Sequence, residues 1–477
     1  MTVSPQVSET TYRNLIAGEL VEAAATLEVV NPADESVLAL VPDCGAEELD
    51  RAMAAASEAF KSWRKVDVET RRAALMKVAD VIEENVEELG ALLTSEQGKP
   101  LEQAMGEVGM SALWLRGAVS QTVEDQIIED SEERLSRLRR VPLGVVAGIV
   151  PWNFPVLMAV QKLGPALLTG NTLVLKPSPF TPLATLRLTE LIADVFPAGV
   201  LNIITGGDQL GPLMTSHPAV AKVSFTGSSA TGKKVMESAA HDLKRITLEL
   251  GGNDASIVMP DVDVPAVAQQ LFWSSFTNAG QICIAAKRVY IHEDIYDEMA
   301  AALKAIAEQV KVGDGTDPET GVGPIQNLRQ LRRVEGLVAD AKERGLNFLT
   351  GGERAPDQRG YHMPITLLDN PPEDARIVCE EQFGPVLPLM KFKTIEEVVA
   401  KANDSDYGLA GAVWSADEEV GLEIAEQLET GTVWINEFLH LSPFAPFGGH
   451  KHSGFGAEFG KEGLEAYTYP QVITIKR

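Results

Sequence analysis

A thiol, a carboxylate and a side-chain amide occur in three short segments that are rich in glycine or proline. They are Cys283 in Asn-Ala-Gly-Gln-Ile-Cys283, Glu249 in Leu-Glu249-Leu-Gly-Gly and Asn153 in Pro-Trp-Asn153-Phe-Pro. A thiolate can attack a carbonyl carbon, an amide can donate a hydrogen bond to the oxyanion that forms, and a carboxylate can activate water. Together these groups supply the parts for covalent chemistry on a carbonyl compound.

The residues around each cysteine decide between two interpretations. An unperturbed cysteine, with a pKa of about 8.5, is mostly protonated at neutral pH, so a nucleophile needs a lowered pKa or a nearby base. A lone cysteine is more commonly a buried structural residue, and we keep that interpretation for Cys44 and Cys379. The Gly-Gln-Ile sequence before Cys283 favours a nucleophile there.

The composition is that of a soluble globular chain with two or three domains. It has 477 residues, of which 45% are hydrophobic and 23% charged, and this length exceeds what one core supports. The net charge of -27 argues against a nucleic-acid partner, because no basic cluster is available to neutralise phosphates. The three cysteines are widely spaced and form neither a disulfide framework nor a metal-ligand pattern, which fits a reducing cytoplasm.

We expect no targeting sequence, membrane span or bound metal. Residues 1–11 are polar and lack a basic region followed by an apolar stretch, so they do not resemble a signal peptide. No apolar run approaches the ~20 residues needed to span a bilayer. The acidic run at 124–133 is interrupted by Ile127 and Ile128, which favours a solvated surface hairpin over a partner-binding strip.

The spacing of apolar residues changes from helical to strand-like near Val145. Before that point it predicts helices at 46–63 and 68–93. After it, short β-branched runs alternate with helical stretches, which predicts a doubly wound parallel sheet with right-handed crossovers. The predicted strands are 145–150, 172–175, 200–204, 222–225 and 247–250, with helices at 183–195 and 230–239.

A second alternating set follows without an intervening linker. It has strands at 256–259 and 289–291 and helices at 264–277 and 295–310, and similar signals continue to about Asn436. We place the boundary between the sets near Gly251-Gly252. The chain ends in an alternating segment at 466–476, which predicts an edge strand able to pair with another subunit.

Two segments at the ends of predicted strands are suited to a nucleotide, although the Gly-x-Gly-x-x-Gly fingerprint is missing. Lys176 and Ser178 follow the second strand, at the carboxyl end where such sheets bind ligands. Phe225-Thr-Gly227-Ser228 leads into a helix, whose amino terminus attracts phosphate, and Gly211 opens another helix. Taken singly, Lys176 can be a surface residue and Gly227 a turn.

The whole pattern resembles the NAD(P)-dependent aldehyde dehydrogenases. Seven segments occur in the family's order and cover the chain from about Tyr12 to the end. They are 151–155, 176–178, 225–228, 248–252, 280–283, Glu-Gln-Phe-Gly-Pro at 381–385 and Pro-Phe-Gly-Gly at 446–449. One such segment is weak evidence, but seven in order identify the chain as a member of the hydrolytic, non-phosphorylating type.

The resemblance implies an α/β fold with three parts. A Rossmann-like cofactor domain would comprise residues 12–122 and 141–250, and an α/β catalytic domain residues 251–440. A small β oligomerisation element would join residues 123–140 to residues 460–477, giving a homodimer or homotetramer.

The resemblance also implies a role for each candidate catalytic residue. Cys283 would be the nucleophile, Asn153 the oxyanion donor together with the Cys283 backbone N–H, and Glu249 the base that hydrolyses the thioester. Glu458 matches a proton-relay position and Lys162 an active-site lysine. The alternatives are a turn residue for Asn153, an exposed strand-end charge for Glu249, a solvated carboxylate for Glu458 and a snorkelling helix lysine for Lys162.

Ten residues match the family's cofactor contacts or the segments around them. These are Trp152, Lys176, Ser178, Gly211, Phe225, Gly227, Ser228, Gly251, Glu381 and Phe383. Pro179 departs from the pattern, because many NAD-specific members carry a glutamate there for the ribose 2′-hydroxyl. NADP is therefore not excluded, but NAD is preferred because no arginine stands nearby to bind a 2′-phosphate.

The aldehyde is the least predictable part. Motif matching suggests a pocket lined by Phe154, Met158, Gln161, Ile282, Ile284, Leu441, His440 and Phe444. These mostly apolar residues favour an aromatic or medium-chain aldehyde. Gln161 stands where succinic-semialdehyde members carry arginine, which weighs against that substrate while leaving other semialdehydes open. His440 can equally be a plain loop residue.

Three other functions fit the sequence less well. Acylating relatives that pass the thioester to coenzyme A generally lack the glutamate, so Glu249 argues against that type. A catalytically idle binding protein on this fold would have little reason to keep thiol, amide and carboxylate together. A thiol hydrolase would need a histidine near Cys283, and it would leave the nucleotide segments unexplained.

Overall fold

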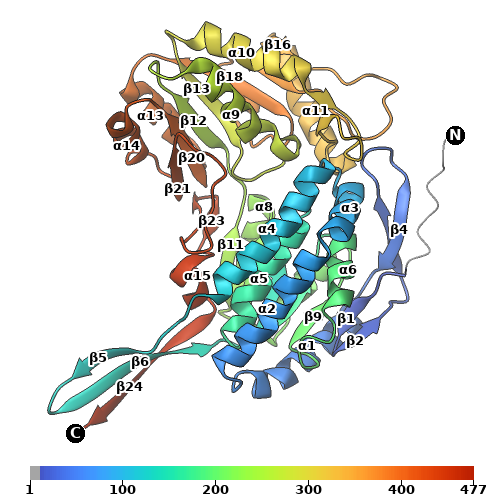
Figure 1. Ribbon diagram of the computed structural model, residues 1–477, viewed down its shortest axis with the longest axis vertical. Helices are drawn as coiled ribbons and strands as arrows, with labels where there is room; N and C mark the ends of the chain where they lie inside the picture. The colour runs from blue at the N-terminus through green and yellow to red at the C-terminus, as the bar shows by residue number, and fades with distance from the viewer. Residues whose placement is uncertain (1–10) are drawn as a thin grey trace.

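Two mixed sheets covered by helices form two lobes, and a three-stranded sheet projects from them as an arm (Figure 1). The computed structural model describes residues 11–477. The expectation that residues 1–11 carry no signal peptide therefore falls, except for Thr11, outside the described residues. The α/β fold class predicted from the sequence is confirmed.

The first lobe is built on an eight-stranded sheet whose centre is parallel. In spatial order its strands are β2 (Glu19–Val21), β1 (Asn14–Ile16), β9 (Leu201–Ile203), β8 (Thr172–Lys176), β7 (Val145–Ile149), β10 (Val220–Thr226), β11 (Arg245–Glu249) and β23 (Gly454–Phe455). All five strands predicted in this set are present within a few residues. β23, which pairs antiparallel with β11, was not predicted, because two residues give no periodic signal.

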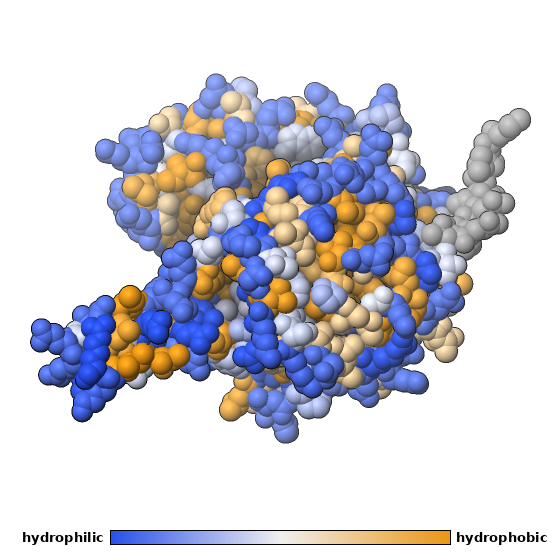
Figure 2. All heavy atoms as spheres, turned by 60° about the horizontal axis from the view of Figure 1, so that its bottom comes forward, coloured by the Kyte–Doolittle hydropathy of each residue, from blue (hydrophilic) through white to orange (hydrophobic). Residues whose placement is uncertain are grey.

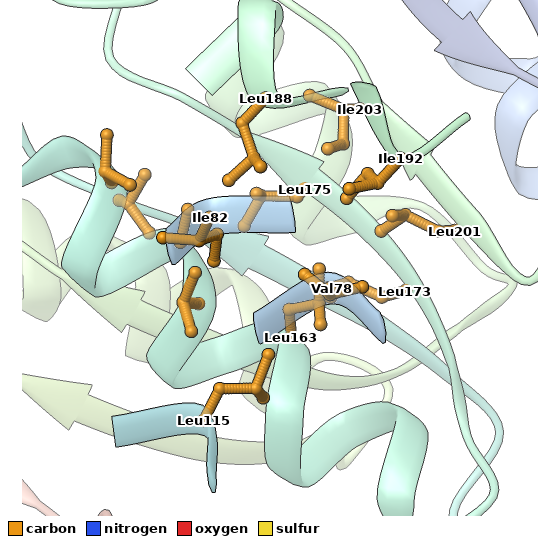
Figure 3. Packing of buried hydrophobic residues seen from close by; sticks show 14 of the residues in the cluster. Val78, Ile82, Leu115, Leu163, Leu173, Leu175, Leu188, Ile192, Leu201 and Ile203 are labelled. Atoms are coloured by element: carbon orange, nitrogen blue, oxygen red, sulfur yellow. The ribbon is translucent and has the colours of Figure 1, made fainter. Parts of the chain in front are cut away.

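Helices cover both faces of this sheet because its strands are apolar on both sides. Leu173 and Leu175 of β8 face one core, which Figure 3 shows from close by, while Val174 between them faces the other. The helices of this lobe are α1 (Ala46–Trp63), α2 (Val68–Glu84), α3 (Val86–Gln97), α4 (Leu101–Val119), α5 (Pro155–Leu168), α6 (Leu183–Leu191), α7 (Leu210–Ser216) and α8 (Ser229–Ala240).

One predicted helix is wrong in its extent. The segment predicted as a single helix over residues 68–93 is two helices, α2 and α3, which meet at Asn85. The Asn85 side chain donates to the Val81 carbonyl at 2.7 Å, and its φ of −120° departs from the helical value. Asparagine ends helices in this way because its side chain competes for backbone hydrogen bonds.

The second lobe contains a seven-stranded, mainly parallel sheet. Its order is β16 (Asn347–Thr350), β17 (Thr366–Asp369), β18 (Val386–Phe392), β13 (Ala286–His292), β12 (Asp254–Val258), β20 (Ala410–Trp414) and β21 (Thr432–Ile435). The helices are α9 (Val264–Phe276), α10 (Tyr296–Gln309), α11 (Leu328–Glu343), α12 (Arg376–Cys379), α13 (Ile395–Asn403) and α14 (Glu418–Ala425). The last long strand of the first sheet ends at Glu249, and the first strand of this sheet along the chain begins at Asp254.

The arm joins distant parts of the chain. β24 (Thr468–Lys476) pairs antiparallel with β6 (Arg134–Pro142), which pairs with β5 (Gln126–Asp130). β24 is an edge strand, as predicted, although it begins at Thr468 because α15 (Gly460–Glu465) occupies the residues just before it. Figure 2 shows apolar residues exposed on the arm. The exposed apolar side chains of its strands include Ile127, Ile128, Val472 and Ile475.

The remaining strands form three short pairs, β3 (Thr26–Val30) with β4 (Val37–Pro42), β14 (Lys311–Val312) with β15 (Thr320–Val322), and β19 (Tyr407–Gly408) with β22 (His450–Lys451). Within residues 11–477, no helix is both long and apolar enough to cross a membrane. The same residues contain no group of three or more His, Cys, Asp or Glu side chains arranged to hold a metal ion.

Candidate active site

The first sheet reverses its winding between β7 and β10. From β7 the chain runs outward through β8 and β9, whereas β10 and β11 lie on the other side of β7. Ligands of such sheets bind beyond the carboxyl ends of the strands at this switch point. Asn153 follows β7, Gly227 and Ser228 follow β10, and Glu249 ends β11. The sheet therefore gathers residues that are almost a hundred positions apart in the chain.

Asn153 connects the two lobes at this point. Its Nδ2 donates to the Gln281 carbonyl at 2.9 Å, and its own carbonyl accepts from Asn278 Nδ2 at 3.0 Å. Both partners lie just before Cys283, so the structure brings the amide to the thiol segment. Because an amide nitrogen carries two hydrogens, one remains for an oxyanion. Asn153 is buried. A residue that only formed a turn would not need these hydrogen bonds to the other lobe.

A buried ion pair between Lys99 and Glu107, not predicted from the sequence, contacts the backbone of Asn153. Lys99 Nζ donates to the Asn153 carbonyl at 2.8 Å and to Glu107 Oε2 at 2.5 Å. Glu107 Oε1 accepts the N–H groups of Val156 and Leu157 in the first turn of α5. The ammonium also lies 3.9 Å from the centroid of the Phe154 ring, a favourable cation–π contact. These contacts fix the loop that carries the amide.

The segment before Cys283 is held in a strained turn. Asn278 and Ala279 have φ of 53° and 56°, in the left-handed region, and Gly280 follows with φ of 71°. Such angles cost non-glycine residues on the order of 1–2 kcal/mol each. A Cβ on Gly280 would lie 2.5 Å from the Gly384 carbonyl oxygen, so only glycine fits. Strain of this kind persists where surrounding contacts over-determine the backbone.

The Cys283 thiol is protonated in this environment. Burial raises its pKa to about 12; the Lys287 charge acts in the opposite direction, and the carboxyls of Asp254, Glu381 and Glu249 raise the pKa further. A thiolate forms either because the pKa of the thiol is lowered or because a nearby base takes its proton. The pKa of Cys283 is raised here, so its reaction needs a base. The other cysteines differ from one another, because Cys44 is buried as expected whereas Cys379 is exposed, contrary to its interpretation as a buried residue.

Glu249 is a buried carboxyl at the end of β11. Its side chain is buried, which makes the alternative of an exposed strand-end charge wrong, and neither carboxylate oxygen has a hydrogen-bond partner among the described residues. Burial first, and then the charge of Glu458, raise the pKa of Glu249 well above its ordinary value, while Lys162 acts in the opposite direction. An unpartnered buried carboxyl is costly, and such groups are found where catalysis needs them.

Lys162 and Glu458 form a second buried pair. Lys162 Nζ lies 2.8 Å from Glu458 Oε1 and donates to Thr226 Oγ1 at 2.8 Å and Ser224 Oγ at 3.1 Å. Tyr467 extends the network by donating to Ser224 Oγ at 3.2 Å. Both charged residues are buried, so the alternatives of a snorkelling lysine and a solvated carboxylate are wrong. The pair sets the electrostatic environment of Glu249.

Several predicted cofactor residues from different elements meet beside this site. The rings of Trp152 and Phe383 make an edge-to-face contact with centroids 5.4 Å apart. Glu381 Oε1 accepts the Gly252 N–H at 3.1 Å. A Cβ on Gly251 would lie 2.3 Å from Glu381 Oε2, so a side chain at this position would displace the Glu381 carboxylate.

The nucleotide segments keep groups free for a ligand. Lys176 is buried, and the nearest acceptor to its Nζ within residues 11–477 is the Pro177 carbonyl at 3.5 Å. Burial lowers the pKa of Lys176 to about 8, as expected for a cation without a close partner. The alternative that Lys176 is a surface residue is wrong. Ser178 is also buried, and its hydroxyl accepts the Phe180 N–H.

The Gly227 turn brings α8 up to this surface. Ser228 caps α8 by accepting the Thr231 N–H at 3.3 Å, and its side chain is exposed. A Cβ on Gly227 would lie 2.5 Å from the Phe225 ring, so Gly227 is more than a replaceable turn residue. Gly211 lies in the first turn of α7, where a Cβ would meet open space, and none of the contacts above involves it.

An apolar cluster surrounds Cys283. Four residues expected to line the substrate pocket belong to it, namely Phe154, Ile282, Ile284 and Leu441. Sequence reasoning missed its remaining members, which are Ala285, Leu409, Ala410, Trp434, Leu439, Phe447 and Phe459. Met158 packs instead against the core of the first lobe, Gln161 is buried outside the cluster, and His440 and Phe444 are exposed.

The family model of the "Aldehyde dehydrogenase family" matches residues 20–473. The chain belongs to that family. As an aldehyde dehydrogenase it oxidises an aldehyde to the carboxylic acid and reduces NAD(P).

Relatives of this aldehyde dehydrogenase match over almost their whole length. The phenylacetaldehyde dehydrogenase of Pseudomonas fluorescens is 39% identical over 97% of this chain and 96% of its own. A Bacillus cereus aldehyde dehydrogenase solved as an NAD+ complex superposes with a TM-score of 0.93, at 38% identity over 98% of this chain and 97% of its own. An NADP-dependent enzyme of E. coli superposes at 0.95, with 37% identity and 98% of each chain covered.

The charges around Glu249 make the pH dependence testable. Because Glu249 must be ionised to act as a base, turnover should rise with pH through its raised pKa. Glu458→Gln removes a charge that raises this pKa, so the rising limb should move to lower pH. Lys162→Met removes a charge that lowers it, so the limb should move to higher pH. Plots of kcat against pH check both shifts, and loss of rate without opposite shifts would contradict the assignment of the base.

Proposed function

We propose that this aldehyde dehydrogenase oxidises an aromatic or medium-chain aldehyde, with Cys283 as nucleophile, Asn153 as oxyanion donor and Glu249 as base. The observation that carries this proposal is the hydrogen bond from Asn153 Nδ2 to the Gln281 carbonyl. It ties the amide to the backbone two residues before the thiol, although 130 positions separate Asn153 from Cys283 in the chain.

The first step is attack of the Cys283 sulfur on the aldehyde carbon. The thiol proton passes to Glu249, and the carbonyl oxygen becomes the oxyanion of a thiohemiacetal. Asn153 Nδ2 and the Cys283 N–H donate hydrogen bonds to it. Removing one such donor typically costs about 2.7–4 kcal/mol of transition-state stabilisation. The contacts of Lys99 and Asn278 with Asn153 keep that donor in place before substrate arrives.

The residues that face the switch point fit a dinucleotide. Lys176 and Ser178 would hold the adenosine ribose, and the amino terminus of α8 with Ser228 the pyrophosphate. Glu381 and the rings of Trp152 and Phe383 would hold the nicotinamide riboside. Of the remaining predicted contacts, Phe225, Gly227 and Gly251 shape the surface around these groups, whereas Gly211 has no close neighbour that requires glycine. When bound, the nicotinamide supplies the hydride acceptor.

The second step is hydrolysis of the thioester that Cys283 then carries. Glu249 first gives the thiol proton to solvent and then accepts a proton from water, and the hydroxide so formed attacks the thioester carbon. The carbon–sulfur bond breaks, the acid leaves, and the proton on Glu249 passes to the sulfur to restore the free thiol. A dry, unpartnered carboxylate is a stronger base than an exposed one. This environment favours hydrolysis over transfer of the acyl group to coenzyme A.

We infer NAD as the preferred cofactor. Pro179 provides no carboxylate for the ribose 2′-hydroxyl, but Asp208 and Asp43 lie near enough to act electrostatically on Lys176. Their negative charges disfavour a 2′-phosphate at the same place. The apolar cluster around Cys283 favours an uncharged aromatic or medium-chain aldehyde, and the phenylacetaldehyde dehydrogenase relative supports this choice.

Mutation of the two reactive groups tests the mechanism. Cys283→Ser should abolish turnover while NAD+ still binds, because the cofactor groups are untouched. Glu249→Gln should slow the burst of NADH and lower steady-state turnover by at least about 100-fold, because Glu249 accepts a proton in both steps. Stopped-flow absorbance resolves the burst and nucleotide fluorescence measures binding. Near-normal activity of Cys283→Ser would reject the mechanism.

A panel of aldehydes assayed with each cofactor tests the specificity. We expect kcat/KM for phenylacetaldehyde and medium-chain aldehydes to exceed that for betaine aldehyde and succinic semialdehyde, because a charged group gains nothing in the apolar cluster. NAD+ should give the higher kcat/KM for each aldehyde. A preference for a charged aldehyde or for NADP+ would overturn the corresponding inference.

We infer a homodimer or dimer-based tetramer assembled through residues 123–140 and 460–477, and a cytoplasmic location. Among residues 11–477, one backbone edge of β24 has no partner strand, and apolar side chains are exposed beside it. Both features favour pairing with a second copy. The three free thiols fit a reducing compartment. Multi-angle light scattering should give at least twice the 51.4 kDa chain mass, and cell fractionation tests the location; a monomer would exclude the assembly.

A further inference from the structure

Lys287 touches two parts of the site, and no step above uses it. It lies in β13, four residues after Cys283, and its side chain is buried. Its Nζ donates to the Cys283 carbonyl at 2.5 Å and lies 3.5 Å from Glu381 Oε1. One ammonium group therefore connects the backbone of the nucleophile to the carboxylate that we assign to the cofactor.

The charges that face Cys283 are otherwise negative. Glu249 comes from β11, Asp254 from β12 and Glu381 from the loop before β18, and all three disfavour a thiolate. Within residues 11–477, no cation is paired with Asp254, which is buried. Its Oδ1 accepts the Ala410 N–H at 3.2 Å, and its Oδ2 has no partner among the described residues. The positive charge of Lys287 opposes these carboxylates and lowers the pKa of the Cys283 thiol.

The neighbouring cation cannot replace Lys287. Arg288 directs its guanidinium to backbone carbonyls, with Nε on Asn253 at 2.8 Å and Nη2 on Ala402 at 2.8 Å. Those bonds hold the ends of β12 and α13. Lys287 is thus the buried cation that contacts both the Cys283 backbone and a carboxylate of the site.

We propose that Lys287 is a positioning residue that couples Glu381 to the reactivity of Cys283. Its ammonium fixes the Cys283 carbonyl and offsets the Glu381 charge, so that the thiolate forms more readily. The proposal rests on the roles given above to Cys283 and Glu381. It goes beyond them by making the nucleophile sensitive to the residue expected to bind the cofactor.

Alkylation of Cys283 by iodoacetamide, followed by mass spectrometry of its peptide across pH without cofactor or aldehyde, tests the proposal. Lys287→Met should slow alkylation by about tenfold at a pH below the thiol pKa, which corresponds to a shift of one pKa unit. Lys287→Arg keeps the charge and should restore most of the rate. Lys244→Met is the matched control, because Lys244 is a buried lysine that pairs with Asp242 away from the site, and it should leave the rate unchanged.

Glu381→Gln provides a second test if Lys287→Met fails to fold, as judged by circular dichroism. Removing the carboxylate charge should speed alkylation of Cys283, and in the double variant the effects of the two substitutions should not add. An unchanged alkylation profile in Lys287→Met, or strict additivity in the double variant, would overturn the proposal. Since no aldehyde is used, this failure is distinct from failure of the proposed oxidation, which the Cys283→Ser assay reports.

Discussion

The site depends on one junction between the two lobes, where Asn153 exchanges hydrogen bonds with the segment that leads to Cys283. The first sheet supplies the amide and the second lobe supplies the thiol, so neither lobe contains the site alone. The Lys99–Glu107 pair fixes the Asn153 backbone on one side, and the left-handed turn at Asn278 and Ala279 fixes the other. Strain and buried charge are tolerated here because together they set the relative position of two reactive groups.

A second constraint is that the buried carboxyl groups of the site have few positively charged partners. Glu249 and Asp254 are buried carboxyls whose oxygens include ones without a partner in the described part of the chain, and burial raises the pKa of the Cys283 thiol. Two lysines offset this negative charge. Lys162 pairs with Glu458, and Lys287 lies close to Glu381. In the mechanism proposed above, this arrangement gives Glu249 the basicity that hydrolysis needs, while leaving Cys283 dependent on a neighbouring base.

Local sequence patterns predict most of the fold but little of the electrostatics. Five strands of the first sheet are predictable because short runs rich in apolar and β-branched residues alternate there with helical stretches. Cys283, Glu249 and Asn153 are recognisable from their glycine- and proline-rich segments. Lys99, Lys287 and Tyr467 could not be found in this way, because their importance comes from partners distant in the chain. The break at Asn85 was missed since apolar periodicity continues through it, and two-residue β23 is too short to leave a periodic pattern.

The return of the chain to the first sheet at β23 also orders the assembly of the enzyme. Glu458 and Tyr467 lie within the last 20 residues, yet they contact Lys162 and Ser224, which are 296 and 243 positions away. Contacts of such separation form late, because a long loop must close first. A chain still being synthesised therefore carries the proposed nucleophile before the charges around the proposed base are complete, and the site is finished only after the segment from Glu458 to Tyr467 has been made.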